Sequence, residues 1–324
     1  MNMRLERFID PALLDLVEES RTLNAQRRAS GERRGPANER ELAAARAALE
    51  AVPIPDRAED RVVRVGDHRV GVRVIAPASG TSRGVYLDVH GGGFSMGTPV
   101  RGDARNVRLA DALGVTVVSV DYRLAPEHPW PAAPDDVEAA LLWAMDEVGT
   151  GFGSGGCVIG GSSAGATLVM AAMLRLRDRG LSAPVRGAVL TFGAFDLSGR
   201  TPFGRRYGDE WFIQAYAGHV ADRTVPDISP IFGDMGGLPP TLVVVGSLDL
   251  LLEDSLAMVA RLSAAGNGVD LRVFPESVHG FTGLPTAMAR AAETSTAGWI
   301  AERLRGDRGS VPGTTEITAP LDPA

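Results

Sequence analysis

The chain has 324 residues, of which 44% are hydrophobic and 23% are charged, a composition typical of a globular enzyme. This length suits one large α/β domain with an insertion, or two smaller domains. The net charge of −7 argues against a general nucleic-acid-binding protein, because such proteins present a basic face. Cys157 is the only cysteine, which excludes an intrachain disulfide and a cysteine-based zinc site.

The sequence also gives an expectation about location. Its apolar runs are shorter than the roughly 18–20 residues that a membrane-spanning helix needs. The first 18 residues mix Arg4, Arg7, Asp10 and Asp15 into the apolar positions, unlike a secretory signal. We therefore expect a cytoplasmic protein without membrane insertion.

The N-terminal third contains helical patterns and then a hairpin. Residues 10–28 and 38–49 have apolar side chains at helical spacing, which predicts a helical segment within residues 1–50. Two β-rich runs, 61–65 and 69–75, are separated by the turn dipeptide Gly66-Asp67 and predict two paired strands.

Beyond the hairpin, short apolar strands alternate with helical patterns. Strands are expected at 85–89, 115–120, 157–159, 185–192, 241–245 and 271–274, and helices at 106–113, 133–148, 166–177, 253–265 and 287–305. Short, almost wholly apolar strands that alternate with helices predict a mostly parallel sheet covered on both faces. We expect the catalytic domain to span residues 51–305.

One connection, residues 193–240, is much longer than the others and is rich in aromatic and charged residues. Long connections of this kind are usually functional and often form a lid, the alternative being an exposed insertion without a role. We expect a cap insertion at about 197–228. Its Trp211, Phe212 and Tyr216 are predicted to line a substrate pocket, although a place in the core of the cap fits the same pattern.

The last segment, residues 306–324, is rich in Pro, Gly and Thr and predicts a disordered tail.

Residues 161–165, Gly-Ser-Ser-Ala-Gly, match the G-x-S-x-G pattern of a nucleophile elbow with Ser163 at its centre. An apolar run precedes them and a helix-forming stretch follows, which is the strand–turn–helix context that the motif requires. His90-Gly-Gly-Gly93 matches the loop that supplies oxyanion donors in lipases and esterases. We expect the backbone N–H groups of Gly92, Gly93 and Ala164 to form the oxyanion hole.

A serine hydroxyl needs a neighbouring base to attack an ester at neutral pH, and this motif places an acid and then a histidine further along the chain. Two histidines follow Ser163. His219 falls within the irregular insertion, whereas His279 comes directly after the last predicted strand. Active-site residues of open α/β folds collect at the carboxyl ends of strands, so His279 is the predicted base.

Asp249 is the predicted acid, because it follows the strand 241–245 as His279 follows 271–274. Its carboxylate would fix the tautomer of His279 that leaves Nε2 free to accept the serine proton. Glu253 and Asp254 are the alternatives, but they lie within the next helix and suit its positive N-terminal end.

These motifs, with two further segments, resemble the bacterial hormone-sensitive-lipase-like esterases (family IV) of the α/β-hydrolase fold. The matching segments are His90-Gly-Gly-Gly-Phe94, Asp121-Tyr-Arg-Leu-Ala-Pro-Glu-His-Pro129, the elbow, Gly237-Leu-Pro-Pro240 and His279-Gly-Phe281. The resemblance covers about residues 85–281. It implies an α/β-hydrolase fold, an N-terminal helical cap joined by part of the insertion, and short-chain carboxylic esters as substrates.

For individual residues, the resemblance implies that Arg123 and Glu127 hold the active-site loops without contacting substrate. Phe94 is expected to be a substrate-binding residue. The chain departs from the family pattern at Ser162, where Asp, Glu or Thr is usual, at Ala166, where glycine is usual, and at residues 250–252. These departures leave the catalytic atoms in place and concern the subclass and the substrate.

We therefore expect a serine carboxylesterase that acts on a small-molecule ester, without a metal or other cofactor and without a nucleic-acid partner. A homodimer is compatible with the resemblance. Two alternatives stay open: an amidase or deacetylase that uses the same triad, and a non-catalytic small-molecule receptor on the same fold, although such receptors typically lack the histidine.

Overall fold

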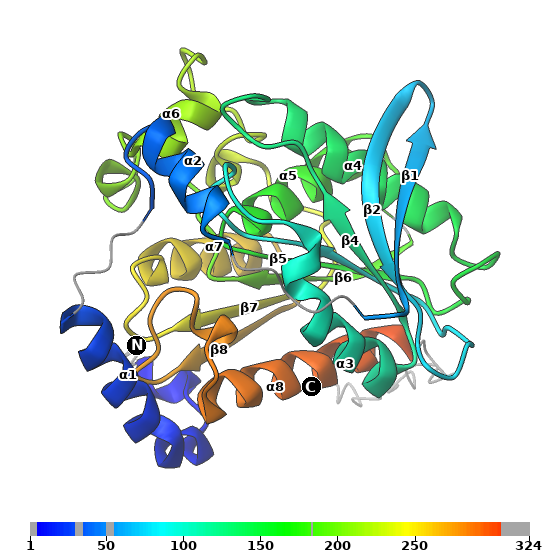
Figure 1. Cartoon of the computed structure of the whole chain (residues 1–324), viewed down its shortest axis with the longest axis horizontal. Helices are drawn as coiled ribbons and strands as arrows, with labels where there is room; N and C mark the ends of the chain where they lie inside the picture. The colour runs from blue at the N-terminus through cyan, green and yellow to red at the C-terminus, as the bar shows by residue number, and fades with distance from the viewer. Residues whose placement is uncertain (1–4, 30–34, 50–54, 183, 306–324) are drawn as a thin grey trace, which may run out of the picture.

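A twisted sheet runs through the middle of the protein, with helices on both of its faces (Figure 1). The computed structural model describes residues 5–29, 35–49, 55–182 and 184–305. Within them the sheet has eight strands, in the order β1-β2-β4-β3-β5-β6-β7-β8. The strands are β1 (Ala58–Val65), β2 (His68–Ile75), β3 (Val85–Val89), β4 (Thr116–Asp121), β5 (Cys157–Ser162), β6 (Val185–Thr191), β7 (Thr241–Gly246) and β8 (Val269–Phe274).

The sheet is antiparallel at one edge and parallel elsewhere. Strand β2 pairs antiparallel with both β1 and β4, and the strands from β4 to β8 in the sheet order run parallel. All residues of β3 and β7 are buried, whereas β1, at the edge, is largely exposed. This confirms the predicted fold class, because parallel strands covered on both faces read as continuous apolar runs.

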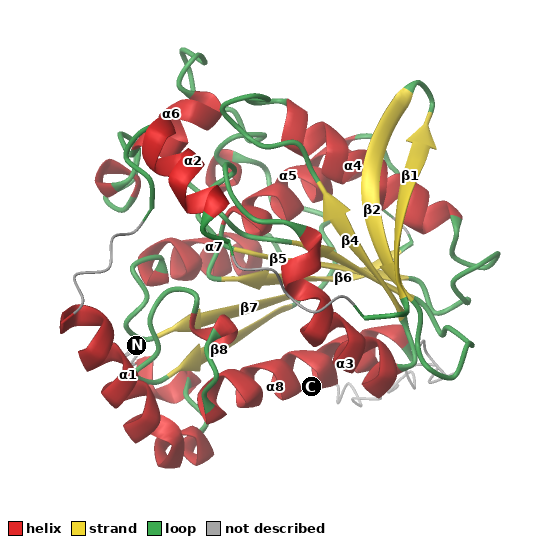
Figure 2. Cartoon of the chain, viewed as in Figure 1, coloured by secondary structure: helices red, strands yellow, loops and turns green. Residues whose placement is uncertain are grey.

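Two layers of helices cover the sheet (Figure 2). The main helices are α3 (Asp103–Leu113), α4 (Ala132–Asp146), α5 (Ala164–Asp178), α7 (Leu252–Ala264) and α8 (Ala287–Leu304). Helices α4, α5 and α7 pack into one buried apolar cluster, and α3 and α8 into a second. Neighbouring strand residues divide between the clusters, as Leu87 and Tyr86 do, because successive side chains point to opposite faces.

The described part of the N-terminal segment is helical, but the helix expected at residues 10–28 begins as a 3₁₀-helix. Residues Pro11–Leu16 form a 3₁₀-helix whose first turn is capped by Asp10, and α1 (Val17–Ala29) follows. Helix α2 (Glu39–Ala47) begins after Asn38, whose side chain accepts a hydrogen bond from the N–H of Glu41. The predicted tail, 306–324, lies outside the described residues, and the domain boundaries stay predictions. In the described part of the chain, the helices are too short or too polar to cross a membrane.

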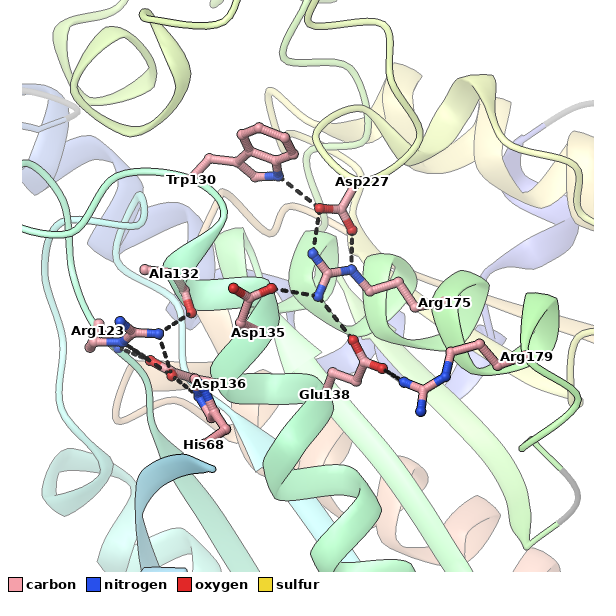
Figure 3. A network of polar contacts seen from close by, with 10 residues as sticks. All are labelled: His68, Arg123, Trp130, Ala132, Asp135, Asp136, Glu138, Arg175, Arg179 and Asp227. Carbon is pink, nitrogen blue, oxygen red and sulfur yellow. Dashed lines mark hydrogen bonds and ion pairs between the residues drawn. The ribbon is translucent and has the colours of Figure 1, made fainter. Parts of the chain in front are cut away.

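The long insertion contains α6 (Trp211–Ala217) and is fastened to the helices beneath it (Figure 3). Asp227 accepts hydrogen bonds from Arg175 Nε of α5, at 2.5 Å, and from the indole N–H of Trp130, at 2.8 Å. Arg175 also contacts Asp135 and Glu138 of α4. Since Arg175 and Asp227 are both about one-fifth exposed, this network ties the insertion to α4 and α5 in a half-buried setting.

Asp254 of α7 holds the beginning of the same insertion. Its carboxylate is 1% exposed and accepts hydrogen bonds from the backbone N–H groups of Phe195 and Asp196. Burial disfavours the charged form and raises the pKa of Asp254 to about 7, although the two N–H groups act in the opposite direction. The folded protein therefore binds a proton at this site at pH values where the unfolded chain does not.

We expect Arg175→Met to lower the free energy of unfolding by roughly 1–3 kcal/mol, between the values for exposed and for fully buried ion pairs. The substitution keeps much of the apolar stem and leaves Asp227 without its guanidinium partner. Urea unfolding measures the effect. Arg179→Met is the matched control, since Arg179 is half exposed and contacts Glu138 alone in this network. Equal losses in the two variants would contradict a special role for Arg175.

Asp254→Asn should become more stabilising, relative to the natural protein, as the pH rises. The pKa of Asp254 in the folded protein lies above its unfolded value of about 3.9. Ionisation of this residue therefore lowers the free energy of unfolding as the pH rises from about 4 to about 7, and the loss persists above pH 7. Asparagine stays neutral and keeps a side-chain oxygen for the two N–H groups. Unfolding free energies at pH 5 and pH 8 should diverge by on the order of 1–4 kcal/mol. Glu253→Gln, at an exposed neighbouring position, should show no comparable divergence.

Candidate active site

Ser163 lies on a tight turn between β5 and α5 and has a strained backbone. Its φ of +51° and ψ of −121° fall outside the regions that non-glycine residues normally occupy. The flanking glycines make this turn sterically feasible. A Cβ on Gly161 would lie 2.5 Å from the Gly165 carbonyl group, and a Cβ on Gly165 would lie 2.1 Å from the carbonyl oxygen of Val89. The G-x-S-x-G spacing is thus required by close packing.

Asp249 and His279 reach this turn from the ends of the two neighbouring strands, β7 and β8. His279 Nε2 is 3.1 Å from Ser163 Oγ, and His279 Nδ1 is 3.1 Å and 3.2 Å from the two carboxylate oxygens of Asp249. Asp249 is 6% exposed and also accepts a 2.7 Å hydrogen bond from the N–H of Leu251. The Phe192 ring packs edge-on against the imidazole. The structure thus brings together the three side chains predicted to form the triad.

The alternative residues lie elsewhere. Asp254 points to the start of the insertion, and the His219 ring lies near that of Trp130, with centroids 6.4 Å apart. Neither makes a hydrogen bond with Ser163 or His279 within the described part of the chain.

The loop that follows β3 brings Gly92 and Gly93 beside Ser163. Their φ angles of +129° and +59° favour glycine, and a Cβ on Gly92 would lie 2.0 Å from the carbonyl oxygen of Met96. Among the described residues, the N–H groups of Gly92, Gly93 and Ala164 have no hydrogen-bond acceptor. Unpaired backbone donors near a nucleophile can receive a negatively charged oxygen.

His90 supports this loop from behind. Its ring stacks on Tyr122 at a centroid distance of 4.2 Å, and the Tyr122 hydroxyl donates to the His90 carbonyl oxygen. Burial lowers the pKa of the imidazole, so the ring is neutral near pH 7. His90 therefore helps to fix the backbone that carries Gly92 and Gly93.

A cavity of about 1920 Å³ opens over Ser163, which lines it together with His279, Gly92, Gly93 and Ala164. Of the four predicted substrate-binding residues, Phe94 and Phe212 line this cavity. Tyr216 instead lies behind Phe94, fully buried and stacked on its ring at 4.0 Å. The cavity lining contains neither Trp211 nor Tyr216 within the described part of the chain.

Other lining residues escaped the sequence analysis, among them Tyr207, Ile213, Leu248 and Leu251. Tyr207 is one of the aromatic residues of the insertion, but its sequence position alone did not assign it to the pocket. Helical spacing in α6 places Phe212 and Tyr216 on one face, because they are four residues apart, and places Trp211 on another. This spacing argues against Trp211 as a lining residue but does not separate Phe212 from Tyr216. Which of these rings reaches the cavity depends on packing against Phe94.

The N-terminal segment covers the site from two sides. The Asn24 amide donates to the carbonyl oxygen of Glu276, close to His279, at 2.8 Å. Arg46 of α2 bonds the Glu127 carboxylate at 2.6 Å and the carbonyl oxygens of Ser95 and Ala125. The Arg46 guanidinium lowers the pKa of Glu127. Glu127 thus links α2 to the loops beside the nucleophile.

Arg123 has a different set of partners. Its guanidinium bonds the buried carboxylate of Asp136 on α4, which also contacts His68 of the hairpin (Figure 3). Arg123 therefore positions its loop against α4. Among the described residues, no group of three or more His, Cys, Asp or Glu side chains could hold a metal ion.

Comparison with known proteins identifies the family to which this chain belongs. A family model described as the alpha/beta hydrolase fold matches residues 86–283. The ethyl acetate hydrolase of Pseudomonas putida is 31% identical over 255 residues, which cover 74% of this chain and 80% of that protein.

Two solved structures have the same architecture and align with most of this chain. The hyperthermophilic esterase from the archaeon Pyrobaculum calidifontis has a TM-score of 0.75 and 29% sequence identity, with 91% of this chain and 98% of that chain covered. A hormone-sensitive-lipase homologue from a metagenome library has a TM-score of 0.74 and 29% identity, with 88% and 98% covered.

Proposed function

Because this chain belongs to the α/β-hydrolase family, and within it to the bacterial hormone-sensitive-lipase-like esterases, we propose that it is a serine carboxylesterase of short-chain carboxylic esters. The contact between His279 Nε2 and Ser163 Oγ, at 3.1 Å, carries this proposal. The ethyl acetate hydrolase activity named for the Pseudomonas putida relative supports a small ester as the substrate.

In the proposed reaction, Ser163 Oγ attacks the ester carbonyl while His279 Nε2 accepts the serine proton. Asp249 holds the Nδ1 proton of His279 and stabilises the imidazolium that forms. The imidazolium then donates its proton to the departing alcohol, which leaves an acyl group on Ser163. A water molecule deprotonated by the same imidazole attacks the acyl-enzyme and releases the carboxylic acid.

The attack converts the carbonyl oxygen into an oxyanion, which needs donors already in place. We assign this role to the N–H groups of Gly92, Gly93 and Ala164, and the absence of acceptors for them among the described residues supports the assignment. Each such donor contributes ~2.7–4 kcal/mol to transition-state stabilisation. Ala164 is the first residue of α5, so the positive end of that helix dipole acts in the same direction.

The residues around the nucleophile favour an enzyme over a receptor. A receptor would require only the cavity, whereas this site also aligns an imidazole and a buried carboxylate on the serine hydroxyl. We propose residues 1–50 and 197–228 as a cap over the cavity, which the contacts of Asn24 and Arg46 support. The cytoplasmic location and the homodimer stay predictions.

Ser163→Ala should reduce the hydrolysis of p-nitrophenyl acetate by at least about 10⁴-fold, because the nucleophile is lost while the fold persists. Ser263→Ala, at an exposed position on α7, is the matched control and should retain full activity. A fluorophosphonate probe should label the control and fail to label Ser163→Ala. Undiminished turnover by Ser163→Ala would refute the proposed mechanism.

Phe212→Ala should shift the acyl-chain preference towards longer esters. The Phe212 ring lies against Gly93, where a Cβ would be 3.0 Å from it, so its removal enlarges the cavity beside the oxyanion loop. A series of p-nitrophenyl esters from acetate to laurate measures the shift. Trp211→Ala should give a smaller shift. A larger shift for Trp211→Ala than for Phe212→Ala would show that Trp211, and not Phe212, limits the length of the acyl chain.

A further inference from the structure

The cavity over Ser163 is larger than a short ester requires. Its volume of about 1920 Å³ exceeds the ~300–1,000 Å³ of typical small-molecule sites. Phe94, Phe212 and Ile213 bound the part of the cavity beneath the cap. The cavity also extends in a second direction, between the sheet and the layer formed by α3 and α8.

The direction of this extension follows from strand alternation. Tyr86, Ser162 and Val189 all line the cavity, and their positions on β3, β5 and β6 face α3 and α8. From the opposite side, Arg105 of α3 and Ala297 of α8 line the same space. The two helices lie side by side on this face (Figure 1). We call this part of the cavity, lined by Tyr86, Asp88, Arg105, Ser162, Ala292 and Ala297, the inner arm.

Ser162 lies where the inner arm meets the catalytic cavity. Its side chain is half-buried, and within the described residues its hydroxyl makes no hydrogen bond. A longer side chain at this position would project into the junction. Helix α8 lines this part of the cavity with the small side chains of Ala292 and Ala297.

The surroundings of the inner arm carry an excess of positive charge, although the whole chain has a net charge of −7. Arg101, Arg105, Arg108 and Arg290 line this side of the cavity, against the acidic residues Asp88 and Glu293. Arg105 bonds Asp88 at 2.6 Å, and Arg108 bonds Glu293 at 2.8 Å. For the guanidinium groups of Arg101 and Arg290, the described residues provide no ion pair.

We propose that the inner arm binds the distal part of an elongated ester substrate, an apolar chain that ends in an anionic group held by Arg101 and Arg290. The apolar and small residues accommodate the chain, and guanidinium groups bind carboxylates in bidentate geometry. The proposal rests on the proposed esterase function for the bond that is cleaved. The anionic end can belong to the acyl group or to the alcohol, and the experiment separates these two sources.

Two pairs of esters test the charge preference. The p-nitrophenyl monoester of octanedioic acid is compared with p-nitrophenyl octanoate, and 8-acetoxyoctanoate is compared with octyl acetate. In at least one pair, kcat/KM should be about tenfold higher for the anionic member, and that pair identifies the side of the ester that enters the arm. The double variant Arg101→Gln, Arg290→Gln should abolish the preference. Arg64→Gln, on the distant edge strand β1, should retain it.

A second variant tests the place of binding. Ala297→Leu fills the inner arm and should lower the anionic preference of the same pair at least fivefold. Gly298→Leu is the matched control on α8, because a Cβ at Gly298 meets no atom within 4 Å. Equal kcat/KM values within both pairs, or a preference that survives Ala297→Leu, would overturn the proposal.

A binding measurement separates this proposal from the esterase function. In calorimetric titrations, octanedioate should bind the natural protein more tightly than octanoate, and Ala297→Leu should weaken octanedioate binding. If octanedioate binds in this way but p-nitrophenyl acetate is not hydrolysed, the inner arm stands and the proposed function fails. If p-nitrophenyl acetate is hydrolysed but octanedioate does not bind, the inner arm proposal fails.

Discussion

The close contact between α5 and β3 is the constraint on which the site depends. Helix α5 begins so near Val89 that any side chain at Gly165 would overlap the carbonyl oxygen there. The glycine loop continues directly from Val89, so one contact sets both the strained turn of Ser163 and the position of Gly92 and Gly93. The strain of a positive φ at a serine is tolerated because the surrounding core of β5 and α5 is fully packed.

Parallel strands supply the remaining chemistry. Because the carboxyl ends of β5, β7 and β8 meet at one edge of the sheet, residues separated by 116 positions, Ser163 and His279, come within 3.1 Å. Asp249 is buried beside them and held by the N–H of Leu251, which limits its movement. The sheet therefore sets the relative positions of Ser163, Asp249 and His279, and the short loops after the strands orient their side chains.

The insertion beside the site is held by polar contacts that differ in how much charge they bury. Arg175 and Asp227 form a half-buried ion pair that links the insertion to α5. Asp254 is almost fully buried, and the described residues provide no cationic partner for it. On the opposite side of the sheet, small residues of α8 and paired arginines of α3 leave an open space connected to the nucleophile. The protein thus combines a tightly packed turn at Ser163 with a large cavity, which fits the proposed substrates that are larger than simple acetates.

Sequence patterns alone were enough to predict the fold class and to single out the three residues of the proposed triad. Strand–helix alternation predicted the parallel sheet, and Ser163, Asp249 and His279 could be selected because each follows a recognisable strand. The folded structure was needed to show that Phe212 lines the cavity while Tyr216 is buried against Phe94, and that Asp254 binds the insertion. Local periodicity gives the relative directions of side chains within a helix such as α6, but long-range packing sets which side of that helix faces the cavity. The inner arm also could not be predicted from local patterns, since it lies between strands and helices that are distant in the chain.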